Sequence, residues 1–340
     1  MSPLVETRED LALFRHVPGL RVPCVRLGRW PTPLEPFEEG LIKRDDLSSP
    51  IYGGNKVRCL EFLFGEALAL GRTHVEAIGA HGTNHGVATL LHAPRVGLSA
   101  SATIFRQPAS ETASANLRVL RRAHRPPLHL PHWFFLPFAL PFRRLRLENA
   151  YVMAPGGATP RGALGYVSAA LELAEQIGPD SDLEAVVVGV GSTCTSAGLL
   201  AGFALARNLG LLRRSPRVVA IRVTPWPVTS HGRIVSLARR ALGELAERSG
   251  DSALTRARDL GAVLTVDGSE LGRGYGYPTK AGRHALSYFR DRAGFELDTT
   301  YSAKAAAAFL RWKPRMRTLF WSTKSTAPLP YGAAQPTEAA

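Results

Sequence analysis

Short apolar segments alternate with helical segments through most of the chain, and this order constrains the fold more than any other feature. Strands are expected at residues 74–80, 99–105, 183–190, 217–223 and 262–266, and helices at 85–97 and 199–210. The run 183–190 is apolar at nearly every position, as in a strand covered on both faces of its sheet. Such alternation is typical of α/β proteins with a mainly parallel sheet. We therefore predict an α/β fold, with twisted sheets of parallel type flanked by helices.

The composition is that of a globular protein with a strong positive charge. The 340 residues include 42 Lys and Arg against 28 Asp and Glu, a net charge of +14, and only six of these cations are lysines. No apolar run approaches the roughly 20 residues of a membrane-spanning helix, and the first residues lack the layout of a secretory signal. Three widely spaced cysteines argue against a disulfide framework. We expect a cytoplasmic enzyme with neither a membrane nor a nucleic-acid partner.

The densest arginine cluster, at residues 118–146, surrounds an aromatic segment at 132–142. No zinc-finger spacing or RNA-binding aromatic motif accompanies it, which disfavours a nucleic-acid role. Pro131, Pro137 and Pro141 are expected to break the segment up, and it is too short to span a bilayer. We interpret it as a solvated basic surface around a hydrophobic loop or short helix. Contact with an anionic partner or with a membrane surface is the less favoured alternative.

Lys56 is the first candidate catalytic residue. It follows a turn made by Gly53, Gly54 and Asn55, with Asn55 as a plausible N-cap, and apolar residues with helical spacing follow it. The pattern predicts Lys56 at the N-terminus of a helix, where partial positive charge disfavours the ammonium and keeps the amine nucleophilic. The alternative is an ordinary surface lysine in a first helical turn.

A second candidate site lies where a predicted strand meets a predicted helix, at Thr83, Asn84 and His85. Backbone amides at such a turn, together with Asn and Thr side chains, can hold a carboxylate. His81 and His85 lie four residues apart, but the glutamate of a zinc-protease motif is missing. We therefore predict a carboxylate pocket here and no metal site.

A third candidate site is the small-residue loop at 191–198, between an apolar strand and a helix. Backbone N–H groups and hydroxyls in such a loop can surround a phosphate at the helix N-terminus. Cys194 breaks the dinucleotide fingerprint, and neither a Walker loop nor a serine-hydrolase elbow is present. The loop predicts a phosphomonoester cup, with a turn needed only for packing as the alternative. The predicted cup consists of Gly191, Ser192, Thr193, Cys194 and Thr195.

A lysine for Schiff-base formation, a carboxylate pocket and a phosphate cup are together the requirements of pyridoxal phosphate chemistry. The order and spacing of the motifs also resemble those of a known family. The chain is similar to the fold-type II pyridoxal phosphate enzymes of the D-cysteine desulfhydrase and 1-aminocyclopropane-1-carboxylate deaminase family, which have a tryptophan synthase beta-like fold. The resemblance is carried by KRDDL (43–47), GGNK (53–56), Asn84-His85, PGGATPRGALGYV (155–167), the loop 191–198, GYGYP (274–278) and LDTTYSAKA (297–305).

The resemblance implies roles for individual residues. Lys56 would hold pyridoxal 5′-phosphate, and Asn84 would hydrogen-bond the ring hydroxyl of the cofactor. Tyr275 and Tyr301 would face the reacting carbons of a small amino-acid substrate. The substrate carboxylate would be received by Thr83, Asn84 and His85, and the further cofactor-binding residues would be Gly191, Ser192, Thr193, Cys194, Thr195, Ser302 and Thr323.

Ser302 bears on the choice between the two activities of this family. Deaminases of the group carry a glutamate directly after the second tyrosine, positioned to protonate the pyridine nitrogen, and this chain has Ser302 there. A hydroxyl partner should leave that nitrogen largely neutral and the ring a weaker electron sink. The resemblance then implies β-elimination like that of a D-cysteine desulfhydrase, giving a 2-oxo acid, ammonia and sulfide. 1-Aminocyclopropane-1-carboxylate deaminase activity is the alternative.

The chain departs from the family pattern at three places. Thr83 replaces the usual serine, Thr193 and Cys194 add bulk to the phosphate loop, and Lys324 stands within a stretch that reads Thr-Gly-Gly in the family. A divergent cofactor-binding protein with altered or no activity is therefore a further alternative. The resemblance also implies a homodimer, for which the aromatic segment 132–142 is a plausible contact surface. It further implies a large cofactor-binding domain of residues 1–57 and 165–340, and a small domain of residues 58–164 that closes over the substrate.

Overall fold

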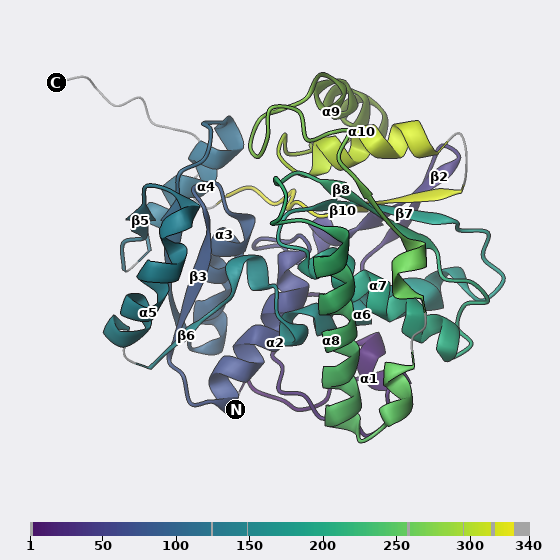
Figure 1. Cartoon of the computed structure of the whole chain (residues 1–340), viewed down its shortest axis with the longest axis horizontal. Coiled ribbons are helices and arrows are strands. Elements are labelled where there is room, and N and C mark those ends of the chain that lie inside the picture. The colour runs from purple at the N-terminus through teal and green to yellow at the C-terminus, as the bar shows by residue number, and fades with distance from the viewer. Residues whose placement is uncertain are drawn as a thin grey trace.

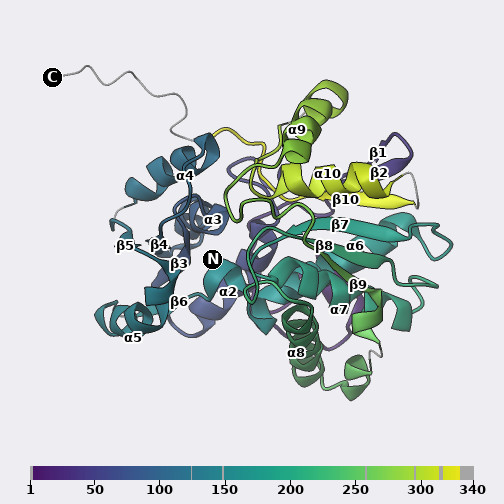
Figure 2. The same cartoon turned by 45° about the horizontal axis from the view of Figure 1, so that its top comes forward.

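The computed structural model describes residues 3–123, 125–147, 149–256, 259–294, 296–313 and 317–329. Two sheets lie side by side within them, each with its own helices (Figures 1 and 2). The larger sheet has the strand order β1-β2-β10-β7-β8-β9, and the smaller one β5-β4-β3-β6. The strands are β1 (Leu34–Phe37), β2 (Gly40–Arg44), β3 (His74–Ala80), β4 (Ser99–Phe105), β5 (Leu128–Leu130), β6 (Ala150–Val152), β7 (Ala185–Val190), β8 (Arg217–Arg222), β9 (Leu264–Asp267) and β10 (Thr318–Ser322).

Neighbouring strands run parallel everywhere except at the pair β1 and β2. Parallel strands need crossover connections, and helices supply them. The predicted α/β fold with parallel-type sheets is therefore confirmed. The helices are α1 (Ala12–His16), α2 (Lys56–Ala69), α3 (Asn84–His92), α4 (Glu111–Arg121), α5 (Leu136–Arg146), α6 (Pro160–Ile177), α7 (Cys194–Asn208), α8 (His231–Ser249), α9 (Lys280–Ala293) and α10 (Ser302–Trp312).

Helices cover both faces of the larger sheet. On one face α9 and α10 bury an aromatic cluster that includes Phe289, Phe309 and Phe320. On the other face α1, α6, α7 and α8 share one apolar core with β7 and β8. Figure 1 shows α9 and α10 above the sheet, and α6, α7 and α8 below it. Because β7 is covered on both sides, its six residues are all buried, as its unbroken apolar sequence predicts.

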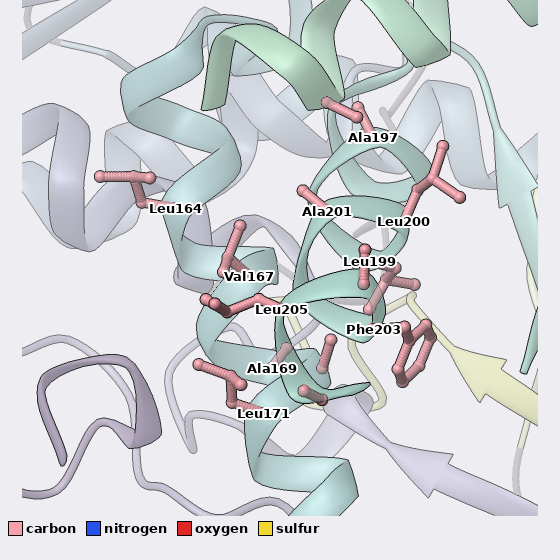
Figure 3. Close-up of a cluster of buried hydrophobic side chains, with 14 of the residues drawn as sticks. Leu164, Val167, Ala169, Leu171, Ala197, Leu199, Leu200, Ala201, Phe203 and Leu205 are labelled. Atoms are coloured by element: carbon pink, nitrogen blue, oxygen red, sulfur yellow. The ribbon is translucent and has the colours of Figure 1, made fainter. Parts of the chain in front are cut away.

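Helices α6 and α7 pack against each other, and their apolar side chains meet in Figure 3. Gly198 and Gly202 make this approach possible, since a Cβ would lie 2.5 Å from the Ala163 carbonyl oxygen and 2.6 Å from the Ala170 Cβ. The prediction that 191–198 is a loop throughout is thus wrong in its second half. Because α7 already begins at Cys194, Gly198 serves helix packing and the turn is confined to the residues before it.

Other predicted elements are reproduced with small shifts at their ends. The strands predicted at 74–80 and 99–105 coincide with β3 and β4, and β7, β8 and β9 lie at or within two residues of their predicted places. The helix predicted at 85–97 instead ends at His92, and a 3-10 turn (Ala93–Val96) leads to Gly97, whose φ of +77° closes it.

The aromatic segment 132–142 is helical, which corrects the prediction that its prolines break it up. A 3-10 turn (Trp133–Phe135) leads directly into α5. Pro137 lies in the first turn, where an N–H has no helical partner to lose. Pro141 lies inside the helix and removes one backbone hydrogen bond without ending it.

The smaller sheet and the larger sheet draw on separate parts of the chain. All strands of the smaller sheet lie between residues 58 and 164, and all strands of the larger sheet lie outside that range. Helix α6 runs without interruption through residue 164, so a boundary there would divide it. The assignment of 58–164 to a closing domain remains a prediction. Within the described residues, no helix is long and apolar enough to cross a membrane.

Candidate active site

Lys56 is the first residue of α2, as predicted. The turn before it is held against the end of β10, where the Asn55 N–H donates to the Thr323 carbonyl oxygen at 3.1 Å. Gly54 has a φ of +94°, and a Cβ there would lie 2.6 Å from that same oxygen. This turn therefore needs glycine both for its conformation and for the close approach of the two segments.

Asn55 is the N-cap residue of α2, as predicted, but its side chain makes no capping hydrogen bond. Its Nδ2 instead donates to the Thr195 Oγ1 at 2.9 Å, across to the first turn of α7. The bond ties the start of α2 to the start of α7. The two predicted elements, the lysine turn and the small-residue loop, are thus brought together by a contact that neither local sequence indicates.

The amine of Lys56 and the hydroxyl of Ser192 converge on one carbonyl oxygen. Lys56 Nζ donates to the Gly156 oxygen at 3.1 Å, and Ser192 Oγ lies 3.5 Å from it. Gly156 has a φ of +63°, and a Cβ on it would come within 2.3 Å of Ser192 Oγ. No acidic side chain of the described residues forms an ion pair with Lys56, so the amine is held by a neutral carbonyl.

The turn before α7 is held in place by two threonine side chains from the segment that follows β8. The Gly191 carbonyl oxygen accepts hydrogen bonds from the hydroxyls of Thr229 (2.5 Å) and Thr224 (3.3 Å). Thr193 adopts a left-handed conformation, with φ of +73°, immediately before the helix. The first N–H groups of a helix have no partner within it, so they are available to a phosphate.

Cys194 points away from this turn. Its side chain is fully buried, and Sγ donates to the Gly157 carbonyl oxygen at 3.1 Å. Burial raises the pKa of the thiol well above its ordinary value. Cys194 is therefore a neutral packing residue whose part in an anion cup is limited to its backbone.

Asn84, Tyr275 and Tyr301 line one pocket between the two sheets. The Asn84 Oδ1 accepts from the Tyr52 hydroxyl at 3.0 Å and from the Asn116 Nδ2 at 2.9 Å. Because both bonds use the oxygen, the Asn84 amide nitrogen is oriented as a donor for a ligand. The residues that line the pocket are Gly82, Asn84, Gln107, Thr112, Ala113, Tyr275, Asp298, Thr300 and Tyr301.

The two predicted tyrosines contact each other, with 3.0 Å between their hydroxyl oxygens and 5.9 Å between ring centroids. Burial raises the pKa of Tyr275 to about 12, and burial together with Tyr275 raises the pKa of Tyr301 well above its ordinary value. Both phenols are thus protonated near neutral pH. Tyr301 also reaches the anion cup, since a Cβ on Gly191 would lie 3.0 Å from its hydroxyl oxygen.

Thr83 and His85 are not among the residues that line this pocket. The Thr83 Oγ1 caps α3 by accepting from the Gly86 N–H at 3.2 Å. The His85 ring is buried, and neither ring nitrogen has a hydrogen-bond partner among the described residues. Burial, and then the charge of Lys56, lower the pKa of His85 to about 3, so the ring is neutral. Their predicted contact with a substrate carboxylate remains a prediction.

Ser302 is bonded to an acid that the motif analysis did not single out. Its Oγ donates to the Asp298 Oδ2 at 2.5 Å, and the N–H groups of Thr300, Tyr301 and Ser302 donate to the same carboxylate. Asp298 therefore fixes the start of α10 and with it the position of Tyr301. Its place three residues before the second tyrosine was the only local signal for this role.

Lys324 lies beside Gly54 and Tyr52, in the stretch where the resemblance to the family implies glycine. Gly54 and Lys324 form an isolated antiparallel bridge, and Lys324 Nζ lies 4.8 Å from the centre of the Tyr52 ring. Nζ also donates to the Ser325 carbonyl oxygen at 3.2 Å. Burial lowers the pKa of this amine, and Asp298 acts in the opposite direction. The chain thus places a second amine next to Tyr52, which itself holds Asn84.

A buried ionic network supports α2 from below. Arg58, two residues after Lys56 in the helix, donates to Asp45 (2.7 Å) and Glu172 (3.0 Å). Lys43 Nζ lies 2.6 Å from the same Glu172 carboxylate. Burial alone would raise the pKa of Glu172, but Arg58 and Lys43 lower it to about 2. The KRDDL motif therefore positions the lysine helix and takes no place in the pocket itself.

The residues present fit pyridoxal 5′-phosphate. The Lys56 amine lies beside the anion cup at Gly156. Gly156 and Gly191 leave room there, because a Cβ on either residue would crowd a neighbouring side chain. Asn84 offers its amide nitrogen, as a ring hydroxyl requires. Among the described residues, no cluster of His, Cys, Asp and Glu could hold a metal ion.

Comparison with known proteins points to the same cofactor. A family described as pyridoxal-phosphate dependent enzyme matches residues 25–319. Nocardicin C-9′ epimerase of Nocardia uniformis subsp. tsuyamanensis is 31% identical over 330 residues, which cover 90% of this chain and 93% of that protein. D-cysteine desulfhydrase of Salmonella paratyphi C (strain RKS4594) is 32% identical over 307 residues, covering 85% and 88%.

The solved structures include an ACC deaminase homologue with a TM-score of 0.76 and 27% identity, covering 96% of this chain and 98% of that one. A hydrogen sulfide-producing enzyme (Fn1220) from Fusobacterium nucleatum, at 14% identity and a TM-score of 0.57, shares the fold. The fold, the cofactor and the family that the sequence resemblance implied are confirmed. The chain belongs to the family of pyridoxal phosphate-dependent enzymes and is a lyase-type member related to the D-cysteine desulfhydrases.

Proposed function

We propose that this enzyme catalyses β-elimination from a small amino acid with a good leaving group, with D-cysteine as the leading substrate. The observation that carries the proposal is the convergence of Lys56 and Ser192 on the Gly156 oxygen, which joins an amine to an anion cup. The similarity to D-cysteine desulfhydrase along 85% of the chain supports the choice of substrate.

The cofactor, when bound, supplies an electron sink for the electron pair at the substrate Cα. Lys56 is placed to take the Cα proton, because its amine is held by a carbonyl and not by an acid. Tyr275 and Tyr301, which are protonated, are placed to donate a proton to the departing sulfur. Asn84, held by Tyr52 and Asn116, orients a ligand oxygen through its amide nitrogen.

The overall reaction balances with water as the only co-reactant. The Cα–H and Cβ–S bonds of D-cysteine break, and hydrolysis of the resulting unsaturated amine gives pyruvate, ammonia and hydrogen sulfide. The electron pair from the Cα–H bond forms the new double bond as sulfur leaves with its own pair. No oxidant or reductant is needed, in keeping with a site built from an amine and two phenols.

Ser302 favours elimination over cyclopropane opening. Its hydroxyl is bonded to Asp298, whose carboxylate already accepts from three backbone N–H groups. An acid committed to the start of α10 is poorly placed to protonate a pyridine nitrogen. A weaker electron sink suits the loss of a good leaving group better than the opening of a carbon ring.

Incubation with a substrate panel tests the proposal. The purified holoenzyme is given D-cysteine, L-cysteine, D-serine and 1-aminocyclopropane-1-carboxylate, and 2-oxo acid and sulfide are measured. We expect pyruvate and sulfide in equal amounts from D-cysteine. If only the cyclopropane substrate reacts and gives 2-oxobutanoate, the enzyme is a deaminase. A protein that takes up no cofactor would overturn both activities.

Lys324 favours a second candidate function, epimerisation at Cα. Inversion needs a proton removed on one face of the Cα and returned on the other, so two proton-carrying groups are required. Lys324 is an amine additional to Lys56, and the relative from Nocardia is named an epimerase. Deuterium uptake at Cα in heavy water, with change of configuration and no 2-oxo acid, would identify this activity.

We also propose that the enzyme acts in the cytoplasm as a homodimer whose smaller domain, 58–164, closes over the substrate. Three free cysteines, Cys24, Cys59 and Cys194, all buried, support a reducing compartment. The resemblance to the family supports the dimer and the domain closure. Light scattering measures the mass in solution, and limited proteolysis with and without substrate tests closure.

A further inference from the structure

The outer surface of α5 and of the turn before it is apolar. Among the described residues, half of the exposed large apolar side chains lie on this one segment. The most exposed are Leu145 (82%) and Phe138 (70%). The full set is Trp133, Phe134, Phe135, Phe138, Phe142 and Leu145.

Three of these residues form a stripe along the helix. Phe138, Phe142 and Leu145 have the spacing i, i+4 and i+7, which places them on one side of α5, and all three are exposed. We call these three residues the apolar stripe. An amphipathic helix of a globular protein normally buries such a stripe against the protein core. In α5 the stripe instead faces the solvent.

Arginines have two different positions around the stripe. Arg143 points inward and pairs with the buried Glu76 of β3 at 3.0 Å, which anchors the helix to the smaller sheet. Arg144 and Arg146 lie one on each side of the stripe, and both are exposed. The Arg146 guanidinium lies 4.4 Å from the centre of the Phe142 ring, and no acid of the described residues pairs with either arginine.

The charged residues of the surrounding sequence are all basic. Residues 112–147 contain no Asp or Glu, and they carry seven arginines. An occupant of this surface must therefore bring negative charge as well as tolerate an apolar face. The arginines are Arg118, Arg121, Arg122, Arg125, Arg143, Arg144 and Arg146.

This charge argues against a second copy of the chain as the occupant. A two-fold symmetric interface brings the same patch of each subunit together, so the arginines would face one another. Nucleic acid would satisfy the arginines but not an outward row of Phe, Phe and Leu. The interface of an anionic bilayer offers acyl chains for the stripe and phosphate groups for Arg144 and Arg146.

We propose that α5 and the turn Trp133–Phe135 form a peripheral anchor that lies on an anionic lipid surface. The apolar stripe enters the headgroup region, and Arg144 and Arg146 contact lipid phosphates on both sides of it. The anchor binds without spanning the bilayer, so the absence of a spanning helix from the described residues is compatible with it. The proposal departs from the prediction of no membrane partner and takes up the contact with a membrane surface that was the less favoured alternative.

The anchor is separate from the active site. In both overall views α5 lies at the outer edge of the smaller sheet, whereas the pocket lies between the two sheets and none of the residues 133–146 lines it (Figures 1 and 2). Lipid binding therefore does not depend on the proposed reaction, and each can fail without the other. The anchor would hold the enzyme at a membrane while leaving turnover of a dissolved substrate unchanged.

Vesicle sedimentation of the full-length holoenzyme tests the anchor. Vesicles of phosphatidylcholine with about one third phosphatidylglycerol are compared with vesicles of phosphatidylcholine alone. The stripe variant Phe138→Ser/Phe142→Ser/Leu145→Ser should bind the anionic vesicles about tenfold more weakly or worse, as should Arg144→Gln/Arg146→Gln. Matched controls are Trp226→Ser, an exposed aromatic residue elsewhere, and Arg239→Gln/Arg240→Gln on α8; both should bind like the parent.

Each variant must retain cofactor absorbance and the parental melting temperature, so that loss of binding is not loss of folding. Trp133 gives a second readout, because its fluorescence should shift to shorter wavelength on anionic vesicles, and Trp133→Phe should abolish the shift. Equal binding to both vesicle types, or none to either, would overturn the proposal. So would a dimer that the stripe variant dissociates, which would make this face a contact between copies, or DNA binding that only the arginine variant weakens.

Discussion

The side-chain amine of Lys56 donates a hydrogen bond of 3.1 Å to the carbonyl oxygen of Gly156, 100 residues further along the chain. The contact places the first residue of α2 against the 3-10 turn Pro155–Gly157, which precedes α6. Gly156 also lies beside Ser192, so this one oxygen marks where an amine and an anion cup meet. Chemistry that needs both an amine and a bound anion can therefore occur at this point.

Replacing Lys56 with Ala should remove both the visible absorbance of the bound cofactor and turnover. The amine is the group that bonds to the cofactor carbonyl and that carries the Cα proton, so kcat should fall by roughly 10³-fold or more. Absorbance spectra and 2-oxo acid release measure the two effects. Lys280→Ala is the matched control, because Lys280 is also the first residue of a helix but is exposed. Retained activity in the Lys56 variant would contradict its role.

Removing either phenol of the tyrosine pair should lower kcat with little change in KM. Tyr275→Phe and Tyr301→Phe each delete a protonated donor, a loss of about 10²- to 10⁴-fold for an acid catalyst. The loss should shrink with a substrate such as β-chloro-alanine, whose leaving group needs no proton. Tyr288→Phe on the outer helix α9 serves as the control. Equal losses with both substrates would assign the tyrosines to binding.

Lys324 should make the affinity for the substrate fall as the pH becomes alkaline. Burial lowers the pKa of its amine from the ordinary value of 10.5, so the ammonium loses its proton at a lower pH than a free lysine does. Once that proton is lost, Lys324 holds an anionic substrate less well. KM should therefore rise with pH in the parent. Lys324→Arg, which stays charged, should keep KM low and flat, while Lys324→Met should keep it high and flat. A parental profile in the Met variant would exclude a role for Lys324 in binding.

The buried carboxylate of Glu172 should make the protein sensitive to acid. Its pKa is about 2 in the folded protein against 4.5 as its ordinary value, so its contribution to stability is present above pH 4.5 and is lost as the pH falls toward 2. Glu172→Gln should lower the free energy of unfolding at neutral pH by about 3–5 kcal/mol, because Arg58 and Lys43 lose their shared partner.

Urea unfolding at several pH values measures this effect. Glu175→Gln on the same helix is the control, since Glu175 is exposed and, within the described part of the chain, forms ion pairs only with Arg15 and His16. Exposed pairs contribute less than about 1 kcal/mol, so this variant should follow the parent. A Glu172 variant as stable as the parent at neutral pH would show that the network is not needed for folding.

The sequence predicted the elements whose pattern is local. The apolar run that became β7 and the turn that became the start of α2 each contain their own signal, in continuous burial and in Gly-Gly-Asn. Strand β10 was not predicted, because its five residues lie between basic segments and show no period of their own. Its place in the sheet depends on β2 and β7, which are distant in sequence.

In the candidate site, too, the residues that belong to local motifs were predicted and those that depend on tertiary contacts were not. Lys56, Asn84 and the two tyrosines belong to motifs, and the structure brings Asn84 and the tyrosines to one pocket. Tyr52 and Asn116 were missed because each matters only through Asn84, 32 residues away in either direction. The inward path of Cys194 and the bonding of Asn55 to Thr195 likewise depend on tertiary contacts that no local pattern contains.

The position of β10 between β2 and β7 has a consequence for biosynthesis. Strand β2 is translated early and β7 midway, yet they cannot be joined until residues 318–322 have left the ribosome and entered between them. Thr323, whose carbonyl oxygen holds the turn before Lys56, directly follows this segment. A nascent chain halted at residue 317 should therefore bind no cofactor. A chain released after residue 329 should bind it. Cofactor binding would then be one of the last steps in the biosynthesis of this enzyme.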